Sequence, residues 1–487
     1  CIFYISKKYF LFFEKNHKIL FFPQNNVIIY KWRKTSEVFL MDKDKFIELV
    51  FKKAQEKNIE EFEIYFLSGG NTSLKVYEGK IENFSDSQNQ GISFRGKFDG
   101  KMGYSYTESF TEDDADFLIN EAGENASIIE SEDEQIIYDG KGEYVPVETY
   151  NSNLENIKIS QIENFLINME KEAKNLNSRV KNINSCMFGM GKGERIIKNS
   201  KGVFLKDKGN VAYTYLSLKA EENGIIKTGS DFKVGRKFEE FDFKKIAQNA
   251  VSDAVSKLNP ISINLKESKC IIENMAFTSL IDSMAGIFSA EAVQKGVSLL
   301  KGKLGEKIAG EKFSLVDDPH LKDGEGSSSF DAEGVPTKYK ELISDGILKT
   351  YLYNLKTAKK DGVNSTGNAS KGGYKGTIGI SSFNLYVKKG EKSFEELLKE
   401  IGNGILITDF AGLHSGLNSI SGDFSLAAEG FLIKNGKKSA PLNQMTVAGN
   451  FFELLKDIDE VGNDLKFSLS STGSPSVLIK KLHFSVE

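Results

Sequence analysis

Apolar residues recur at two different spacings along this chain, and the order of the spacings predicts the fold class. Over residues 42–57, 111–121, 160–174 and 242–258 they recur every three or four positions, as on one face of a helix. Between residues 62 and 106 they alternate with polar residues, which is typical of strands. A helix, a run of antiparallel strands and further helices indicate an α+β fold rather than alternating βαβ units.

Glycine-containing pairs mark the turns that we expect. Four such pairs lie between alternating segments, where they favour β-hairpins: Glu78-Gly79, Asn223-Gly224, Asp345-Gly346 and Asn435-Gly436. The strand that begins at Phe62 is expected to end at Gly69-Gly70. The glycine-rich stretch 189–193 is expected to be a flexible loop, since no dinucleotide fingerprint follows it.

The best domain boundary follows Pro260, which must end the helix that Asp242 caps. Beyond it the chain becomes glycine-rich and strand-like, with helical spacing over residues 277–295. We therefore expect an N-terminal domain of a helix plus an antiparallel sheet over residues 41–260. A glycine-rich, mostly antiparallel β domain with helices is expected over residues 261–487.

Residues 1–40 differ in character from the rest of the chain. They are dense in Phe, Tyr, Ile, Lys and Asn and hold the only tryptophan, Trp32. Their apolar patches are too broken for a membrane span of about twenty apolar residues. Met41 then precedes acidic residues that lead an amphipathic helix, as at a natural start. We expect residues 1–40 to be a non-native or disordered extension, translated from upstream sequence; a mobile N-terminal extension is the alternative.

Composition excludes some function classes and leaves others open. The net charge is −4 over 487 residues, and nearly all the basic residues are lysines, so nothing predicts a nucleic-acid surface. The three cysteines, Cys1, Cys186 and Cys270, form no C-x-x-C pair, which fits a reducing cytoplasm. The latter two have apolar neighbours and are expected to be core residues. The four histidines are equally dispersed: His17, His320, His414 and His483.

One stretch matches part of a phosphate-binding loop, but its spacing fails. Residues 91–97 supply the glycines and the lysine, whereas Phe98 stands where Ser or Thr is required. The surrounding residues indicate strand-turn-strand rather than strand-loop-helix, and therefore favour a hairpin.

A series of short phrases in the second half of the chain resembles the TldD/PmbA family, long labelled modulators of DNA gyrase. The phrases occupy residues 287–296, 302–308, 317–319, 330–337, 346–353, 365–369, 421–425, 447–450, 462–464 and 473–476. Each alone has the composition of a turn, but so many in this order are not expected by chance.

The resemblance implies a zinc motif that this chain has lost. In the metal-binding branch of the family the first phrase reads H-E-x-x-x-H, and its two histidines hold zinc. Here Ala290 and Lys295 stand at those places and only Glu291 remains. A methyl group cannot coordinate zinc, and an ammonium is a repelled cation. The third ligand of that branch is a cysteine near the C-terminus, where this chain reads Ser-Ser-Thr-Gly at 470–473. The chain is thus similar to the PmbA/TldE branch, with no catalytic, cofactor-binding or metal residue of its own.

Glu291 alone is not expected to generate a nucleophile. Without a metal, a bound water keeps a pKa near that of bulk water, about 15.7. The simpler interpretation is a glutamate that is ion-paired with Lys295 one helical turn away.

The resemblance also implies a function and partners. The chain would be the non-catalytic half of a cytoplasmic heterodimer, a zinc metalloprotease that cleaves flexible, extended peptides. A TldD-type subunit would bring the zinc, and this chain would complete the peptide chamber, with no nucleic acid or membrane involved. The loops at 330–336 and 365–369 either line that chamber or serve only as turns.

Two alternatives stay open. One is a metal-free, self-associating peptide-binding module, which would form a homo-oligomer in the absence of the partner. The other is an independent hydrolase with an unrecognised site, with His320 or His414 as candidates.

Overall fold

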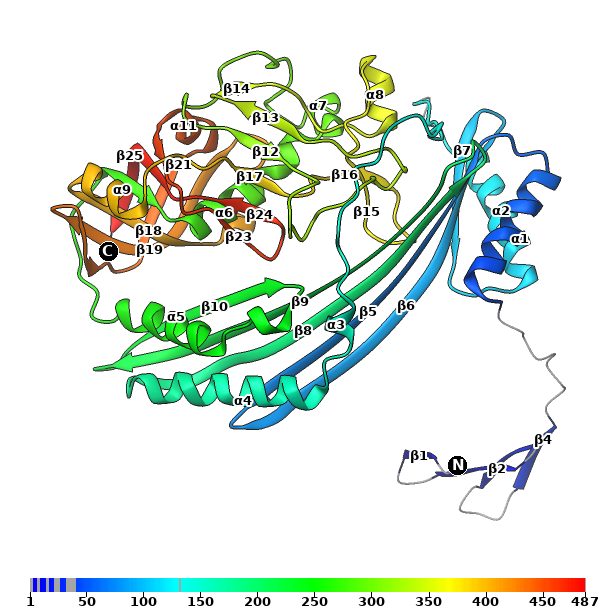
Figure 1. Cartoon of the computed structure of the whole chain (residues 1–487), viewed down its shortest axis with the longest axis horizontal. Helices are drawn as coiled ribbons and strands as arrows, with labels where there is room; N and C mark the ends of the chain where they lie inside the picture. The colour runs from blue at the N-terminus through cyan, green and yellow to red at the C-terminus, as the bar shows by residue number, and fades with distance from the viewer. Residues whose placement is uncertain are drawn as a thin grey trace.

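The computed structural model describes residues 3–6, 9–14, 17–21, 27–31, 41–130 and 133–486 (Figure 1). The first four segments are strands that pair in order as an antiparallel sheet: β1 (Phe3–Ser6), β2 (Tyr9–Glu14), β3 (His17–Phe21) and β4 (Val27–Lys31). The rest of residues 1–40 lies outside the described residues. The expectation that this segment is a non-native or disordered extension stays a prediction. Among the described helices, none is long and apolar enough to cross a membrane.

The first half of the chain builds one antiparallel sheet with the strand order β10-β9-β8-β5-β6-β7. Its strands are β5 (Phe62–Tyr77), β6 (Lys80–Phe98), β7 (Lys101–Thr107), β8 (Val180–Asn199), β9 (Phe204–Glu222) and β10 (Ile225–Gly235). Its helices are α1 (Lys43–Glu56), α2 (Glu112–Ser127), α3 (Ser152–Glu155), α4 (Ile159–Leu176), the 3-10 helix η1 (Phe238–Glu240) and α5 (Phe243–Ser256). Asp242 caps α5, as the sequence predicts.

The long strands run straight through glycines that the sequence analysis assigned to a strand end and to a loop, and both expectations were wrong. Gly69 on β5 pairs with Gly193 on β8, and Gly193 pairs in turn with Gly209 on β9. Cross-strand pairing satisfies these backbone groups, so the low strand propensity of glycine is overridden. Glycine also makes room: a Cβ on Gly189 would lie 2.5 Å from the ring of Tyr213.

Helices cover the outer face of this sheet in two separate groups. Phe66 and Phe94 pack in one buried cluster with residues of α1 and α2. Leu74 and Phe188 pack in a second buried cluster with residues of α4 and α5. Figure 1 shows the sheet bent around the C-terminal half of the chain, which lies against its inner face.

The second half contains two further sheets and short helices. One sheet has the order β11-β18-β19-β21-β25-β22, with β20 beside β19; the other has the order β14-β13-β12-β17-β24-β23, and β15 pairs with β16. The strands are β11 (Glu267–Ile272), β12 (Leu315–Asp317), β13 (Lys340–Ser344), β14 (Ile347–Leu348), β15 (Ala369–Lys371), β16 (Ile378–Ile380), β17 (Leu385–Val387), β18 (Gly404–Ala411), β19 (Asp423–Lys434), β20 (Lys437–Pro441), β21 (Met445–Asn450), β22 (Ile458–Val461), β23 (Lys466–Phe467), β24 (Thr472–Ser474) and β25 (Val477–Val486). The helices are α6 (Asn274–Met284), η2 (Ala285–Phe288), α7 (Ala290–Gln294), α8 (Leu355–Asp361), α9 (Phe394–Ile401), α10 (Leu413–Gly416) and α11 (Phe451–Lys456). The predicted α+β class is therefore confirmed.

All four predicted hairpin turns are present. Both residues of each pair have positive φ, as two-residue hairpin turns require. The turns join β5 to β6, β9 to β10, β13 to β14 and β19 to β20.

The helix expected over residues 277–295 is interrupted, so that prediction was wrong in one respect. Ser289 has an extended backbone with φ −67° and ψ 125°, and it separates η2 from α7. The reason is a pairing with a distant segment. Leu352 donates its N–H to the Phe288 carbonyl at 2.9 Å and accepts from the Ala290 N–H at 2.9 Å.

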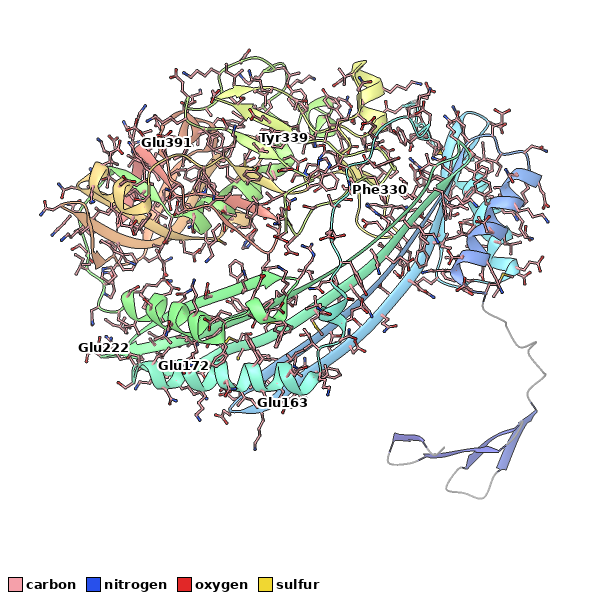
Figure 2. All side chains as sticks on the ribbon, in the orientation of Figure 1. Glu163, Glu172, Glu222, Phe330, Tyr339 and Glu391 are labelled. Atoms are coloured by element: carbon pink, nitrogen blue, oxygen red, sulfur yellow. The ribbon has the colours of Figure 1, made fainter. Side chains whose placement is uncertain are left out.

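Apolar contacts join the two halves of the molecule. Tyr65 and Ile197 on the inner face of the sheet pack with Phe330, Ala332 and Ala369. The guanidinium of Arg195 lies 4.3 Å from the centre of the Phe330 ring. Phe330 stands at this junction in Figure 2.

Candidate functional site

The stretch in which the resemblance places a lost zinc motif forms the short helix α7, which has Lys295 as its C-cap and lies beside α8. Ala290 is fully buried, and its N–H is committed to Leu352. Gln294 donates from its side chain to the Thr357 carbonyl at 2.9 Å, which fixes α7 against α8. Ala290, where the resemblance expects the first histidine, is therefore a packed core position.

Glu291, the one motif residue that remains, is held between two lysines. Its Oε1 atom lies 3.0 Å from Lys295 Nζ and 3.5 Å from Lys356 Nζ. Burial of the carboxylate opposes ionisation, but the hydrogen bond from Lys295 and the charge of Lys356 outweigh it and lower the pKa of Glu291. The ion pair with Lys295 that the sequence suggested is present, and Lys356 adds a second cation.

These residues do not fit a zinc ion. A divalent cation beside Glu291 would meet the ammonium groups of Lys295 and Lys356, and Ala290 offers no donor atom. The segment 470–473 contacts α6 instead, where the Thr472 hydroxyl donates to Asp282. Within residues 41–130 and 133–486, no three His, Cys, Asp or Glu side chains lie together as a metal site would need.

The other candidate residues of the sequence analysis lie apart from one another. His320 has a ring nitrogen 3.0 Å from the Thr337 hydroxyl, and burial lowers its pKa. His414 is exposed on α10. Cys186 and Cys270 are buried free thiols, and burial raises the pKa of Cys186 to about 12. Residues 91–97 lie within strand β6, so they form no phosphate-binding loop.

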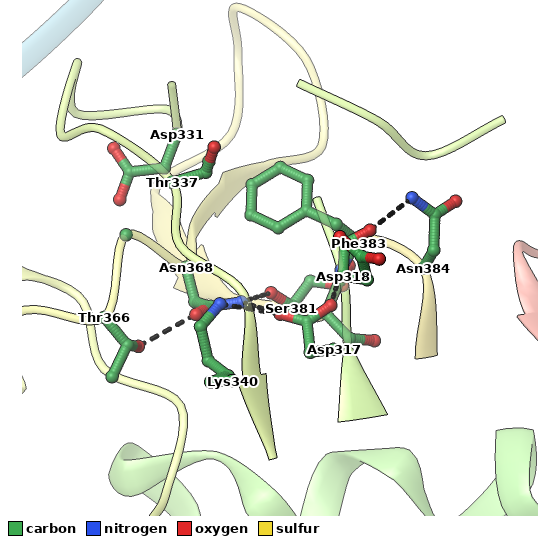
Figure 3. A network of polar contacts seen from close by, with 12 residues as sticks. Asp317, Asp318, Asp331, Thr337, Lys340, Thr366, Asn368, Ser381, Phe383 and Asn384 are labelled. Carbon is green, nitrogen blue, oxygen red and sulfur yellow. Dashed lines mark hydrogen bonds and ion pairs between the residues drawn. The ribbon is translucent and has the colours of Figure 1, made fainter. Parts of the chain in front are cut away.

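A buried polar network, which sequence reasoning did not identify, organises the loops of the second half (Figure 3). Asp317 is fully buried and accepts from Lys340 at 3.0 Å, from the Asn368 amide at 2.7 Å and from the Phe383 N–H at 2.7 Å. Asp331 is also fully buried and accepts three backbone N–H groups, those of Glu333, Val335 and Ala369. The phrases around these residues were the only sequence signal, and their composition indicated turns.

A second network ties the sheet to the loop that contains Asp331. Arg95 on β6 makes two hydrogen bonds to Glu63 at 2.9 and 3.1 Å and one to Glu333 at 3.3 Å. Burial opposes the charge on Arg95, but the two carboxylates outweigh it and raise its pKa. Burial, together with the charge of Glu333, raises the pKa of Asp331 to about 7.

Several cavities open between the first and the second half of the chain, and two of them lie next to each other. The first, which we call the sheet pocket, has a volume of about 390 Å³ and is lined in part by Tyr65, Arg195, Asp207 and Lys371. Lys371 lies over the Tyr65 ring and donates to the hydroxyl of Ser93. Burial lowers the pKa of Lys371 to about 7. Ser93 itself is only 4% exposed and does not line the cavity.

The second cavity, which we call the inter-domain pocket, is larger, at about 780 Å³. It lies between strand β10 and the loops of the second half, and Glu325 lines both cavities. Arg236 stands at their border, with its guanidinium 3.4 Å from Glu325. Ser471, from the segment where the resemblance places the lost cysteine ligand, also lines the inter-domain pocket.

Domain models of one family match most of the chain. The PmbA/TldA metallopeptidase domain 1 matches residues 62–126, the central domain matches residues 152–258 and the C-terminal domain matches residues 266–486. The chain belongs to the PmbA/TldD family. The resemblance carried by its short phrases is thereby confirmed.

Relatives within this family are similar over most of their length. The metalloprotease PmbA of Escherichia coli O157:H7 is 29% identical over 316 residues, which are 64% of this chain and 67% of PmbA. A metalloprotease of Methanocaldococcus jannaschii is 28% identical over 422 residues, which are 83% of this chain and 90% of the relative. The chain is therefore a PmbA/TldE-like member of a metalloprotease family.

Solved structures of the PmbA/TldD family share the fold. A crystal structure of a modulator of a DNA gyrase from Thermotoga maritima, so named, superposes with a TM-score of 0.85 at 32% identity. The superposition covers 91% of this chain and 100% of the Thermotoga maritima chain. TldE from Thermococcus kodakarensis superposes with a TM-score of 0.82 at 25% identity, over 90% of this chain and 100% of TldE.

Proposed function

We propose that this chain is the non-catalytic, PmbA/TldE-type subunit of a cytoplasmic heterodimeric zinc metalloprotease that cleaves flexible peptides. A TldD-type partner supplies the zinc and the general base, and this chain completes the chamber that holds the extended peptide. The observation that carries the proposal is the state of the motif helix α7. The carboxylate of Glu291, which would have to serve as general base, is ion-paired with Lys295 and Lys356. Its neighbour Ala290 is packed into the core.

The cavities support the part of the proposal that concerns the peptide. Strand β10 forms one end of the large sheet, and β23 forms one end of a C-terminal sheet. Both strands line the inter-domain pocket. A strand at the end of a sheet has free N–H and carbonyl groups along one edge, which can hold an extended peptide without reading its sequence.

A mixing experiment tests the subunit role. The purified chain, a zinc-loaded TldD-type subunit and an equimolar mixture are each incubated with a flexible fluorogenic peptide. We expect cleavage only in the mixture, and less than about a tenth of an equivalent of zinc on the isolated chain by metal analysis. Cleavage by the isolated chain would support the independent hydrolase instead, and peptide binding unchanged by mixing would support the self-associating module.

A double substitution tests whether restoring the two histidines is enough to restore zinc binding and hydrolysis. Ala290→His with Lys295→His restores both histidines, yet we expect neither zinc binding nor hydrolysis. The third ligand is still missing, and Lys356 still faces Glu291. Recovered hydrolysis with one equivalent of bound zinc would contradict our account of the third ligand.

A further inference from the structure

The inter-domain pocket carries a positive charge that the chain as a whole does not. Five lysines and two carboxylates line it, whereas the net charge of the protein is −4. The lysines are Lys233, Lys322, Lys388, Lys389 and Lys466; the carboxylates are Asp323 and Glu325. A cavity with an excess of one sign of charge concentrates ligands of the opposite sign.

Three of the five lysines are available to a ligand. Lys388 is paired with Glu341 at 3.0 Å, and Lys466 lies 3.6 Å from Asp231. Lys233, Lys322 and Lys389 are exposed, and no carboxylate of the described residues lies within ion-pair distance of them. One of the two carboxylates of the pocket is already used, since Glu325 faces Arg236 at 3.4 Å.

Aromatic rings lie between these lysines. Tyr386 and Phe467 meet edge to face with their ring centres 5.6 Å apart. Phe232 lines the pocket from the opposite side, and Lys466 Nζ lies 5.3 Å from the centre of its ring. The pocket therefore offers a place for an apolar side chain as well as for carboxylates.

We propose that the inter-domain pocket selects acidic segments of extended peptides. The carboxylates of the peptide pair with Lys233, Lys322 and Lys389, a large apolar side chain packs on the aromatic rings, and its main chain adds to the open edge of β10. The inference rests on the proposed function in assuming a peptide ligand. It adds that this subunit selects substrates by charge.

Binding of two labelled peptides to the full-length chain tests the inference. The first is a flexible peptide of alternating glutamate and phenylalanine; the second replaces every glutamate by glutamine. Fluorescence anisotropy should show tighter binding of the acidic peptide, with an advantage that shrinks as salt is added. The triple variant Lys233→Gln, Lys322→Gln and Lys389→Gln should raise the Kd of the acidic peptide about tenfold, since three exposed ion pairs with the peptide are lost together. It should leave the Kd of the neutral peptide unchanged.

A matched variant controls for net charge. Lys171→Gln, Lys244→Gln and Lys245→Gln remove the same charge from exposed positions on α4 and α5, which cover the outer face of the sheet. We expect this variant to bind the acidic peptide as the unmodified chain does. An equal loss in both triple variants, or equal binding of the two peptides, would overturn the inference.

The outcomes also separate this inference from the proposed function. If mixing with a TldD-type subunit gives cleavage of both peptides at the same rate, the subunit role stands and charge selection is wrong. If the acidic peptide binds through the three lysines but mixing yields no cleavage, the pocket stands and the subunit role is wrong.

Discussion

Two charged triads of this protein differ in their arrangement of charge and in burial. In the first, Arg95 lies between Glu63 and Glu333, and all three side chains are at most 4% exposed. In the second, Glu291 lies between Lys295 and Lys356, and its side chain is 28% exposed. The buried triad joins the sheet to the C-terminal loops, whereas the half-exposed triad lies where the resemblance places a lost zinc motif. The comparison teaches that a charged triad holds distant segments together where water is excluded, and mainly sets the charge of one carboxylate where water reaches it.

The largest effect is expected from breaking the buried triad. Arg95→Met would leave Glu63 and Glu333 uncompensated, and we expect a loss of about 3–5 kcal/mol of unfolding free energy. Denaturant unfolding measures it. Adding Glu63→Gln and Glu333→Gln to the same variant should recover part of the loss, because no buried charge is then unpaired. Equal stability of Arg95→Met and the unmodified chain would show that the triad does not hold the two halves together.

A pH-dependent effect is expected from Asp331, next to the buried triad. Its pKa of about 7 in the folded protein lies above the ordinary value, so the folded state binds this proton more tightly than the unfolded state. The contribution of Asp331 to stability is therefore greatest at low pH and falls as the pH rises from about 4 to about 7. Asp331→Asn should flatten that part of the stability profile. It should also cost about 1–3 kcal/mol, because the Asn amide faces a backbone N–H donor.

The smallest effect on stability is expected from the half-exposed triad. Lys295→Met with Lys356→Met should change the unfolding free energy by less than about 1 kcal/mol. The pKa of Glu291 should rise, since burial would no longer be offset by two cations. A carboxyl titration by NMR measures this. An unchanged titration would mean that the lysines do not control the charge of Glu291.

The sequence predicts the local parts of this structure well and the long-range parts poorly. Capping at Asp242 and the four hairpin turns depend on neighbouring residues, and all were predicted. Gly69 and Gly193 were misread because the partner strands that order them are far away in the chain. The helix break at Ser289 likewise depends on Leu352.

For the candidate site, the sequence supplied residue types but not neighbours. It identified Ala290, Glu291 and Lys295 and the pair between the last two, whereas the approach of Lys356 required the packing of α8 on α7. Arg95 and Asp317 have no local motif, since their partners come from distant loops. The inter-domain pocket draws its lysines from four separate segments, which no spacing along the chain connects.

The aligned glycines Gly69, Gly193 and Gly209 have a mechanical consequence. Three neighbouring strands carry no side chain along one line across the sheet, although every strand there remains paired. Bending along such a line disturbs little side-chain packing and need break no strand pairing. This line of glycines is therefore where the large sheet can curve with the smallest loss of side-chain contacts.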